Sequence, residues 1–217
     1  MTRRERIEKN PWESIHLEDY EKHMSLKSVY QLQALSEIMG KQFAAYEVNS
    51  VMVLGVAGGN GLEHIKGGKF SKIYGVDVNQ DYLDTCKKRY ANLGDRLETI
   101  RADLTVGKLQ LPHAKLLIAD LLIEYIGYDA FAQVVRSVRP GFVSCVIQVN
   151  EGEDFVSDSP YLHCFDRLEE VHCQMEEERL TECMQQIFYQ KKLVEETPLP
   201  NGKKLLRIDY ERKLLIA

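Results

Sequence analysis

The residues with the clearest chemical meaning are glycines that directly follow a short apolar segment. Residues 51–54 read Val-Met-Val-Leu, and four of the seven positions 55–61 are glycine. An apolar run this short, ended by glycines, predicts a buried strand that leads into a tight turn. Glycine allows sharp turns and leaves room for a ligand to lie against the main chain. The segment therefore predicts a loop that binds a ligand through its backbone.

A second apolar run, residues 73–76, ends in the acid Asp77. A glycine-rich turn after one strand, with an acid at the tip of the next about 20 residues on, is the nucleoside-binding arrangement of doubly wound sheets. An ionised carboxylate only accepts hydrogen bonds, so Asp77 can take both hydroxyls of a ribose. The alternative is that Asp77 caps a helix that begins near Asn79 and Gln80.

Two common nucleotide-binding motifs do not fit the sequence. The dinucleotide fingerprint is G-x-G-x-x-G. Counted from Gly59, its third glycine would stand at position 64, which is histidine. A P-loop needs Gly-Lys followed by Ser or Thr, whereas residues 68–70 read Gly-Lys-Phe. A nucleotide-dependent oxidoreductase is therefore disfavoured, although it stays an alternative.

The elements that must position these residues alternate along the chain. Strands are predicted at residues 51–55, 72–77, 97–102, 115–120 and 142–149, and helices between them at 60–66, 80–91 and 127–138. Helical spacing over residues 17–46 precedes the first strand. Alternation of this kind predicts a doubly wound α/β fold, in which a parallel sheet carries helices on both faces.

The C-terminal part departs from this alternation. Helical spacing returns over residues 180–187, and Asn201-Gly202 between 188–196 and 204–212 is a strong hairpin signal. Apolar and charged residues alternate over 206–211, so we expect only one face of that strand to be buried. The predicted sheet therefore has seven strands and is mainly parallel, with a C-terminal antiparallel hairpin.

Together these motifs resemble those of the class I S-adenosylmethionine-dependent methyltransferases, over roughly residues 48–150 and with the terminal hairpin in support. The family has a G-x-G-x-G motif and acids at the ends of its second, third and fourth strands, which match Gly55, Ala57, Gly59, Asp77, Asp103 and Asp120. One departure is Val53, because the family usually has an acid two residues before the first glycine. Another group, such as backbone carbonyls near Gly55, would then hold the amino group of the cofactor's methionine.

The resemblance implies that S-adenosyl-L-methionine is the cofactor and S-adenosyl-L-homocysteine the product. The residues expected to bind the cofactor are Gly55, Val56, Ala57, Gly58, Gly59, Asn60, Gly61, Asp77, Val78, Asn79, Asp103, Leu104, Asp120 and Leu121. In the family's pattern, Asp103 accepts from the adenine amino group and the Leu104 backbone N–H lies beside a ring nitrogen. The alternatives are a solvated loop carboxylate at Asp103 and a helix N-cap or strand-end acid at Asp120.

With 217 residues, the chain fits a single domain. We divide this methyltransferase domain, residues 1–217, into an N-terminal helical cap (1–47), a cofactor-binding core (48–150), a segment that could form a lid (151–175) and a C-terminal helix and hairpin (176–217). The lid is expected because a long irregular loop inside a compact domain is usually functional or an insertion.

Methyl transfer from a sulfonium is an in-line displacement, so the protein mainly supplies alignment and exclusion of water. A neutral oxygen or nitrogen nucleophile can also need a base, but no residue pattern assigns a catalytic base in this chain. The residues expected to contact the substrate are Trp12, Tyr20, His23, Glu124 and Tyr125. An aromatic ring among them could also contact the sulfonium by cation–π attraction. The alternative is that Trp12 and Tyr20 pack a helix against the sheet and that Tyr125 belongs to the core.

Charge and cysteine usage narrow the class of partner. The net charge is −5, so no basic footprint for nucleic acid or an anionic membrane is expected. The charged N-terminus predicts no signal peptide, and the longest apolar stretch, residues 116–123, is far too short to span a bilayer. Five cysteines without a C-x-x-C pair predict reduced thiols in the cytoplasm, with no disulfide framework and no metal site.

The acceptor class follows by elimination. No Asn-Pro-Pro-aromatic tetrapeptide follows residues 115–120, as it does in amino methyltransferases of DNA bases and glutamine, and no cysteine stands where a C5-cytosine enzyme has its Pro-Cys nucleophile. We therefore expect methyl transfer to an oxygen or nitrogen atom of a small molecule. A methyltransferase-like protein that has lost catalysis and acts as a binding or partner subunit stays an alternative. The sequence indicates no oligomeric state.

Overall fold

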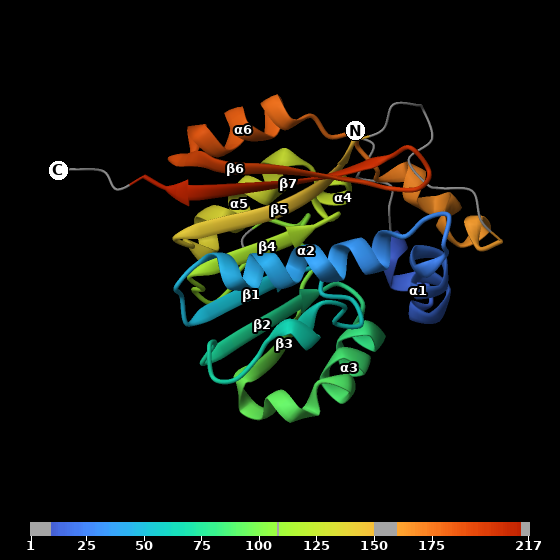
Figure 1. The fold of residues 1–217 in the computed structure, drawn as a ribbon, viewed down its shortest axis with the longest axis horizontal. Helices are drawn as coiled ribbons and strands as arrows, with labels where there is room; N and C mark the ends of the chain where they lie inside the picture. Colours follow the sequence, from blue (N-terminus) through green and yellow to red (C-terminus); the bar gives the residue numbers. More distant parts are fainter. Residues whose placement is uncertain (1–9, 108, 150–159, 214–217) are drawn as a thin grey trace.

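The computed structural model describes residues 10–107, 109–149 and 160–213. Its centre is a seven-stranded sheet in the order β3-β2-β1-β4-β5-β7-β6 (Figure 1). The strands are β1 Ser50–Leu54, β2 Lys72–Asp77, β3 Leu97–Arg101, β4 Leu116–Asp120, β5 Phe142–Val149, β6 Tyr189–Pro198 and β7 Lys204–Arg212. Strands β1 to β5 run parallel, whereas β7 is antiparallel to both β5 and β6. The predicted fold class is confirmed, including the C-terminal hairpin.

Helices cover both faces of this sheet. The α-helices are α1 Leu17–Ser25, α2 Gln31–Ala45, α3 Gln80–Arg89, α4 Ile123–Ile126, α5 Tyr128–Val138 and α6 Glu177–Gln186, and the 3₁₀ helices are η2 Pro11–Ser14, η3 Leu62–His64, η4 Ala91–Arg96 and η5 Leu162–Glu170. Figure 1 shows α2 crossing one face, with α5 and α6 beyond the other. Phe43 of α2 packs in one core cluster with Val53, and Phe131 of α5 packs in another with Met52. Neighbouring residues of β1 thus point to opposite faces, as a pleated strand requires.

The segment 17–46, which has helical spacing, forms the two helices α1 and α2, because the chain turns at residues 26–30 and Tyr30 takes a left-handed backbone (φ 57°) just before α2. The predicted helix 60–66 is wrong, since only the 3₁₀ turn η3 forms there. Helix α2 packs tightly against this part of the chain: a Cβ on Gly61 would meet the Met39 sulfur at 2.5 Å.

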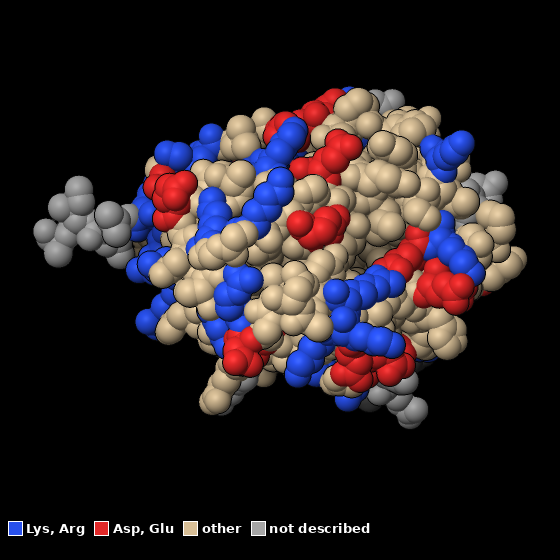
Figure 2. Space-filling model, turned by 60° about the horizontal axis from the view of Figure 1, so that its bottom comes forward, with Lys and Arg blue, Asp and Glu red and all other residues tan. Residues whose placement is uncertain are grey.

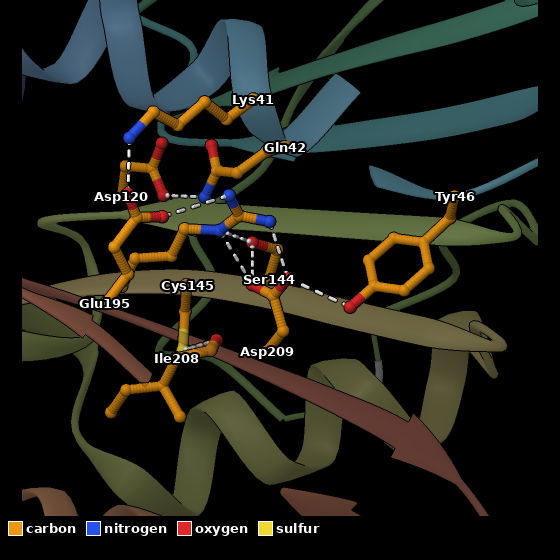
Figure 3. Close-up of polar contacts among 10 residues, drawn as sticks. Lys41, Gln42, Tyr46, Asp120, Ser144, Cys145, Glu195, Ile208 and Asp209 are labelled. Atoms are coloured by element: carbon orange, nitrogen blue, oxygen red, sulfur yellow. Dashed lines mark hydrogen bonds and ion pairs between the residues drawn. The ribbon is translucent and has the colours of Figure 1, made fainter. Parts of the chain in front are cut away.

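Strand β7 is buried on both faces, which corrects the expectation from its alternating sequence. Arg207 is 4% exposed and Asp209 is fully buried. These two side chains form an ion pair, and Asp209 also accepts hydrogen bonds from the hydroxyls of Ser144 and of Tyr46, the latter at 2.9 Å (Figure 3). Because the two charges neutralise each other, α2 can cover this face without burying a lone charge.

The described part of the predicted lid, residues 160–175, lies over the N-terminal helices. Its helix η5 buries Phe165 and Leu168 in one cluster with Ile15. Residues 150–159 lie outside the described residues, so the movement of a lid stays a prediction. On the face drawn in Figure 2, acidic and basic side chains are intermixed. Within the part of the chain that the structure describes, no helix combines the length and apolar character needed to cross a membrane.

Candidate active site

The principal cavity opens at the carboxyl ends of β1, β2 and β4. Its volume is about 320 Å³, which lies within the range of small-molecule sites. The order of the sheet reverses between β1 and β4, and ligands of doubly wound folds bind at this switch point. The predicted cofactor-binding residues that line the cavity are Gly55, Ala57, Asp77, Val78, Asp103, Leu104, Asp120 and Leu121.

Asp77 joins the glycine loop to the end of β2. Its Oδ2 accepts the Ala57 backbone N–H and its Oδ1 accepts the Asn79 N–H, both at 2.9 Å. Burial raises the pKa of the Asp77 carboxyl, and these N–H donors oppose that rise. The loop turns at Gly55 and Ala57, which both have positive φ (65° and 46°). Asp77 therefore fixes the shape of the loop as well as forming part of the cavity wall.

The other predicted residues of the loop do not line the principal cavity but pack next to the residues that do. A Cβ on Gly59 would lie 2.5 Å from the Tyr90 ring, and Gly61 is pressed against Met39, so both glycines serve close packing. Both also have a φ near 90°, a conformation that glycine adopts without strain. The predicted residues Val56, Gly58 and Asn60 line a smaller cavity of about 40 Å³, which shares Gly55, Ala57 and Asp120 with the principal one.

Hydrogen bonds tie the N-terminal segment to the same edge of the sheet. The side chain of Asn79 caps α3 through its Oδ1 and donates from its Nδ2 to the Trp12 carbonyl at 3.0 Å. The Tyr82 hydroxyl donates to the Ile15 carbonyl at 2.9 Å. The N-cap of α3 is thus Asn79 rather than Asp77, and Asn79 acts by holding Trp12 over the cavity.

Asp103 closes a turn at the edge of the principal cavity. Its Oδ1 accepts from the Thr105 backbone N–H at 2.9 Å and from the Thr105 hydroxyl at 2.7 Å. Its Oδ2 accepts a longer hydrogen bond, 3.3 Å, from the Asn10 side chain. The neighbouring Leu104 is buried. The less tightly held Oδ2 is therefore the atom of Asp103 with more capacity for a ligand.

Asp120 and Gln42 leave two buried acceptor atoms unpaired beneath α2. The Gln42 Nε2 donates to Asp120 Oδ1 at 2.8 Å (Figure 3). Among the described residues, Asp120 Oδ2 and Gln42 Oε1 find no hydrogen-bond partner. Burial raises the pKa of Asp120 to about 7, while Gln42 and the Arg207 charge lower it. Because an unpaired buried acceptor is costly, this corner has an unused capacity for a hydrogen-bond donor.

Leu121 carries backbone strain next to Asp120. Its φ is 52°, a left-handed value that residues other than glycine rarely adopt. Its N–H donates to the Val146 carbonyl at 2.8 Å, which anchors it to β5. Strain of this kind clusters at functional sites.

A second cavity of about 60 Å³, which we call the inner chamber, adjoins the principal one. All the predicted substrate-contacting residues line it: Trp12, Tyr20, His23, Glu124 and Tyr125. Trp12, Tyr20 and Tyr125 line both cavities. The Trp12 ring meets Tyr20 and Tyr125 edge to face, with centroids 5.7 and 4.9 Å apart. These three rings therefore form the boundary between the cavities.

Glu124 lines the inner chamber and has one unpaired carboxylate oxygen. The residue is 3% exposed, and its Oε1 accepts the Gln148 backbone N–H at 2.9 Å. Its Oε2 is buried and has no hydrogen-bond partner among the described residues. Burial raises the pKa of Glu124 to about 7. Burial, with the Lys203 charge, lowers the pKa of His23 and brings that of His172 to about 4.

Solved structures with the same architecture identify the fold. The methyltransferase domain of bacterial CtHen1 matches 92% of this chain and 100% of its own, with a TM-score of 0.61 and 16% identity. Magnesium protoporphyrin IX methyltransferase from Synechocystis, solved with bound S-adenosylhomocysteine, matches 90% of this chain and 94% of its own, with a TM-score of 0.63 and 9% identity. The chain has the class I methyltransferase fold.

This fold does not by itself specify methyl transfer. The [4+2]-cyclase SpnF matches 83% of this chain and 81% of its own, with a TM-score of 0.63 and 12% identity. No protein-family model and no curated protein matches the sequence. These neighbours therefore show the fold of this chain, and its chemistry depends on the residues of its own site.

Sequence reasoning missed several residues of this methyltransferase-fold site. They are Asn10, Pro11, Tyr82, Thr105 and Val106 in the principal cavity, and Gln31, Gln148, Phe165 and His172 in the inner chamber. Most come from segments whose approach to the glycine loop has no local signal. The sequence did contain a signal for Gln42, because this residue stands at helical spacing from Leu35 and Ile38 on the buried face of α2. A polar residue in an apolar stripe predicts a buried polar partner.

Proposed function

We propose that this protein binds S-adenosylmethionine in the principal cavity and transfers its methyl group to an oxygen or nitrogen atom of a small molecule. The position of the cavity at the switch point of a methyltransferase fold supports this function. The bound S-adenosylhomocysteine of the Synechocystis neighbour agrees with it. The observation that carries the proposal is the pair of unpaired acceptors, Asp120 Oδ2 and Gln42 Oε1, beside the glycine loop.

These acceptors suit the ammonium group of the cofactor's methionine. Val53 stands where the family usually has an acid, so the ammonium needs another partner in this chain. Asp120 supplies a carboxylate from β4, and Gln42 supplies an amide oxygen from α2. A hydrogen bond between charged groups stabilises more than a neutral one, which is why Asp120 is the main partner that we propose.

The remaining polar groups suit the nucleoside. Each oxygen of Asp77 accepts one backbone N–H, and a carboxylate oxygen can accept a second hydrogen bond. Asp77 can therefore hold the glycine loop and the ribose hydroxyls together. We assign Asp103 Oδ2 to the adenine amino group, because that oxygen is held only by the long bond from Asn10.

When bound, S-adenosylmethionine supplies an electrophilic methyl group. The chain's own residues supply the alignment of the acceptor and the exclusion of water. Trp12, Tyr20 and Tyr125 border both cavities, so they are placed to shield the reacting atoms. The small-molecule acceptor and the cytoplasmic location remain proposals, based on the absence of a basic footprint and on the cysteine usage.

A thermal-shift titration tests cofactor binding directly. We expect S-adenosylmethionine and S-adenosylhomocysteine to raise the melting temperature by about 5 °C or more at a hundredfold excess over Kd, since such an excess adds about 2.7 kcal/mol to the stability. NAD, the control, should produce no shift. A shift with NAD alone would favour the oxidoreductase, and no shift with any of the three ligands would contradict the proposal.

A second candidate function uses this fold without methyl transfer. The neighbour SpnF, which has this fold, is a [4+2]-cyclase. A protein with this second function would bind the cofactor but release no S-adenosylhomocysteine. Incubation with S-adenosylmethionine and fractionated metabolites, followed by measurement of S-adenosylhomocysteine, separates the two. Its formation only in the presence of a metabolite fraction supports the transferase, and tight binding without turnover supports the second candidate.

A further inference from the structure

The inner chamber has the chemical composition of a cation site. Its described lining combines the rings of Trp12, Tyr20, Tyr125 and Phe165 with the amides of Gln31 and Gln148. Aromatic faces attract cations through their quadrupole. Glu124 is the acid of this lining, and neither lysine nor arginine is among the described residues that form it. The chamber therefore offers a negative charge and aromatic surfaces to whatever enters it.

The histidines of the chamber do not compete for this role. Burial and the Lys203 charge hold the pKa of both His23 and His172 below the usual range, so both rings are neutral near pH 7. His23 packs on the Phe165 ring at 4.8 Å and His172 on Tyr125 at 5.7 Å. They contribute polar walls, so Glu124 is the acid of the lining, and the Lys203 charge acts on the chamber from outside its described lining.

The surroundings of Glu124 hold one of its carboxylate oxygens and leave the other for a positively charged partner. The Gln148 N–H fixes Oε1, which orients the carboxylate, and Oε2 is left buried and unpaired. Leaving one oxygen of a buried carboxylate unpaired is unfavourable unless a ligand completes it. A protonated amine does so best, because it brings both a positive charge and several N–H donors.

We infer that the inner chamber binds the protonated amino group of an amine acceptor against Glu124 Oε2, and that Glu124 takes one proton from it. In this step an N–H bond breaks and an O–H bond forms at Oε2, which leaves the lone pair on a neutral nitrogen. Burial favours the transfer, because it disfavours both charged forms. The inference rests on the proposed function, in which this nitrogen is the methyl acceptor, and it makes Glu124 a catalytic residue.

The site can be tested with a probe that needs no knowledge of the natural acceptor. n-Propylammonium and 1-propanol have nearly the same shape, but only the first is charged. Trp12 is the single tryptophan of the chain and borders the chamber, so its fluorescence reports occupancy. Each compound is titrated into the protein at constant ionic strength, with and without saturating S-adenosylhomocysteine. For a ligand of four non-hydrogen atoms the tightest attainable Kd is roughly tens of micromolar, so the titration extends from there into the millimolar range.

We expect saturable binding of n-propylammonium that is at least tenfold tighter than that of 1-propanol. Glu124→Gln should remove this preference, since the amide keeps an acceptor for the Gln148 N–H but loses the charge. Glu178→Gln on the exposed face of α6 is the matched control and should behave as wild type. Equal binding of the two probes, no saturable binding of the amine, or an unchanged preference in Glu124→Gln would overturn the inference.

The outcome is separable from that of the proposed function. If S-adenosylhomocysteine binds and the amine preference is absent, the inference fails while the proposed function stands. If S-adenosylhomocysteine does not bind, the proposed function fails, and the amine titration of the free protein still decides whether Glu124 forms a cation site.

Discussion

The acids in the two halves of the sheet's carboxyl edge differ in how many of their oxygens accept hydrogen bonds within the protein. At the β1–β2 half, both oxygens of Asp77 accept backbone N–H groups. At the β4 half, Asp120 and Glu124 each have one oxygen with a hydrogen-bond donor and one without a partner among the described residues. At the first half each oxygen of Asp77 already has a donor within the protein, whereas at the second half each acid has one buried acceptor that only a ligand can satisfy.

This difference separates Asp77, which has a framework role in supporting the loop in addition to its proposed role at the ribose, from Asp120 and Glu124, whose unpaired acceptors suit a ligand alone. A buried carboxylate that is fully hydrogen-bonded stabilises the loop around it, and its removal leaves donors unpaired. A buried carboxylate with an unpaired oxygen carries a desolvation penalty. A bound cation offsets this penalty. Variants in the two halves should therefore change stability in opposite directions.

Asp77→Ala should have the largest effect on stability. It leaves the N–H groups of Ala57 and Asn79 without their acceptor, and we expect the free energy of unfolding to fall by about 3 kcal/mol. Binding of S-adenosylhomocysteine should be lost with it. Urea denaturation measures the first and calorimetry the second. Asp84→Ala, at an exposed position of α3, should change neither. A stable Asp77→Ala protein would remove the framework role of this acid.

Gly59→Ala should have the next largest effect. The Cβ would meet the Tyr90 ring at 2.5 Å, and the φ of 89° is unfavourable for alanine. We expect a loss of about 2 kcal/mol in the free energy of unfolding. Gly107→Ala is the control, because no described heavy atom beyond its chain neighbours lies within 4 Å of a Cβ placed there. Equal stability of the two variants would show that the loop tolerates a side chain at Gly59.

Asp120→Asn and Glu124→Gln should have the smallest effects, and these should be stabilising. Both acids have a pKa of about 7 in the folded protein, against ordinary values of 3.8 and 4.5. The folded state therefore holds their protons more tightly, so the stability that they contribute is present below about pH 4 and is lost as the pH rises through about 7.

We expect each variant to flatten the fall in stability between pH 5 and pH 8 and to gain about 1 kcal/mol at pH 8. In Asp120→Asn the new amide can also donate to the unpaired Gln42 Oε1. Urea denaturation at the two pH values provides the test. A variant that is less stable than wild type at pH 8 would mean that the ionised acid has a partner, and the contrast with Asp77 would fail.

The sequence was sufficient to predict the framework half of the site. The glycine loop and Asp77 are close in sequence to the strands that carry them, so strand periodicity and the turn residues place them together. The same reasoning placed Asp103 and Asp120 beside this loop, because parallel strands end at one edge. Their binding roles stay predictions.

The ligand-binding half could be predicted only in part. Leu121, Glu124 and Tyr125 follow β4 directly, but the rest of the inner chamber comes from η2, α1, α2, β5 and residues 165–172, whose meeting depends on tertiary packing. The alternation of charges in β7 predicted a solvent-facing side, because sequence periodicity does not reveal that Arg207 and Asp209 pair with each other in a buried position, where Tyr46, at the end of α2, donates to Asp209. The helix expected at 60–66 failed for the related reason that α2 packs against that segment.

The central claim is that a ligand completes the β4 half of the edge. Isothermal titration of S-adenosylhomocysteine into wild type, Asp120→Asn and the surface control Glu178→Gln tests it most directly. We expect saturable binding to wild type and to the control, and binding at least tenfold weaker to Asp120→Asn, because a hydrogen bond to a charged group contributes about 1.5–3 kcal/mol. Unchanged affinity in Asp120→Asn, or no binding to wild type, would contradict the account.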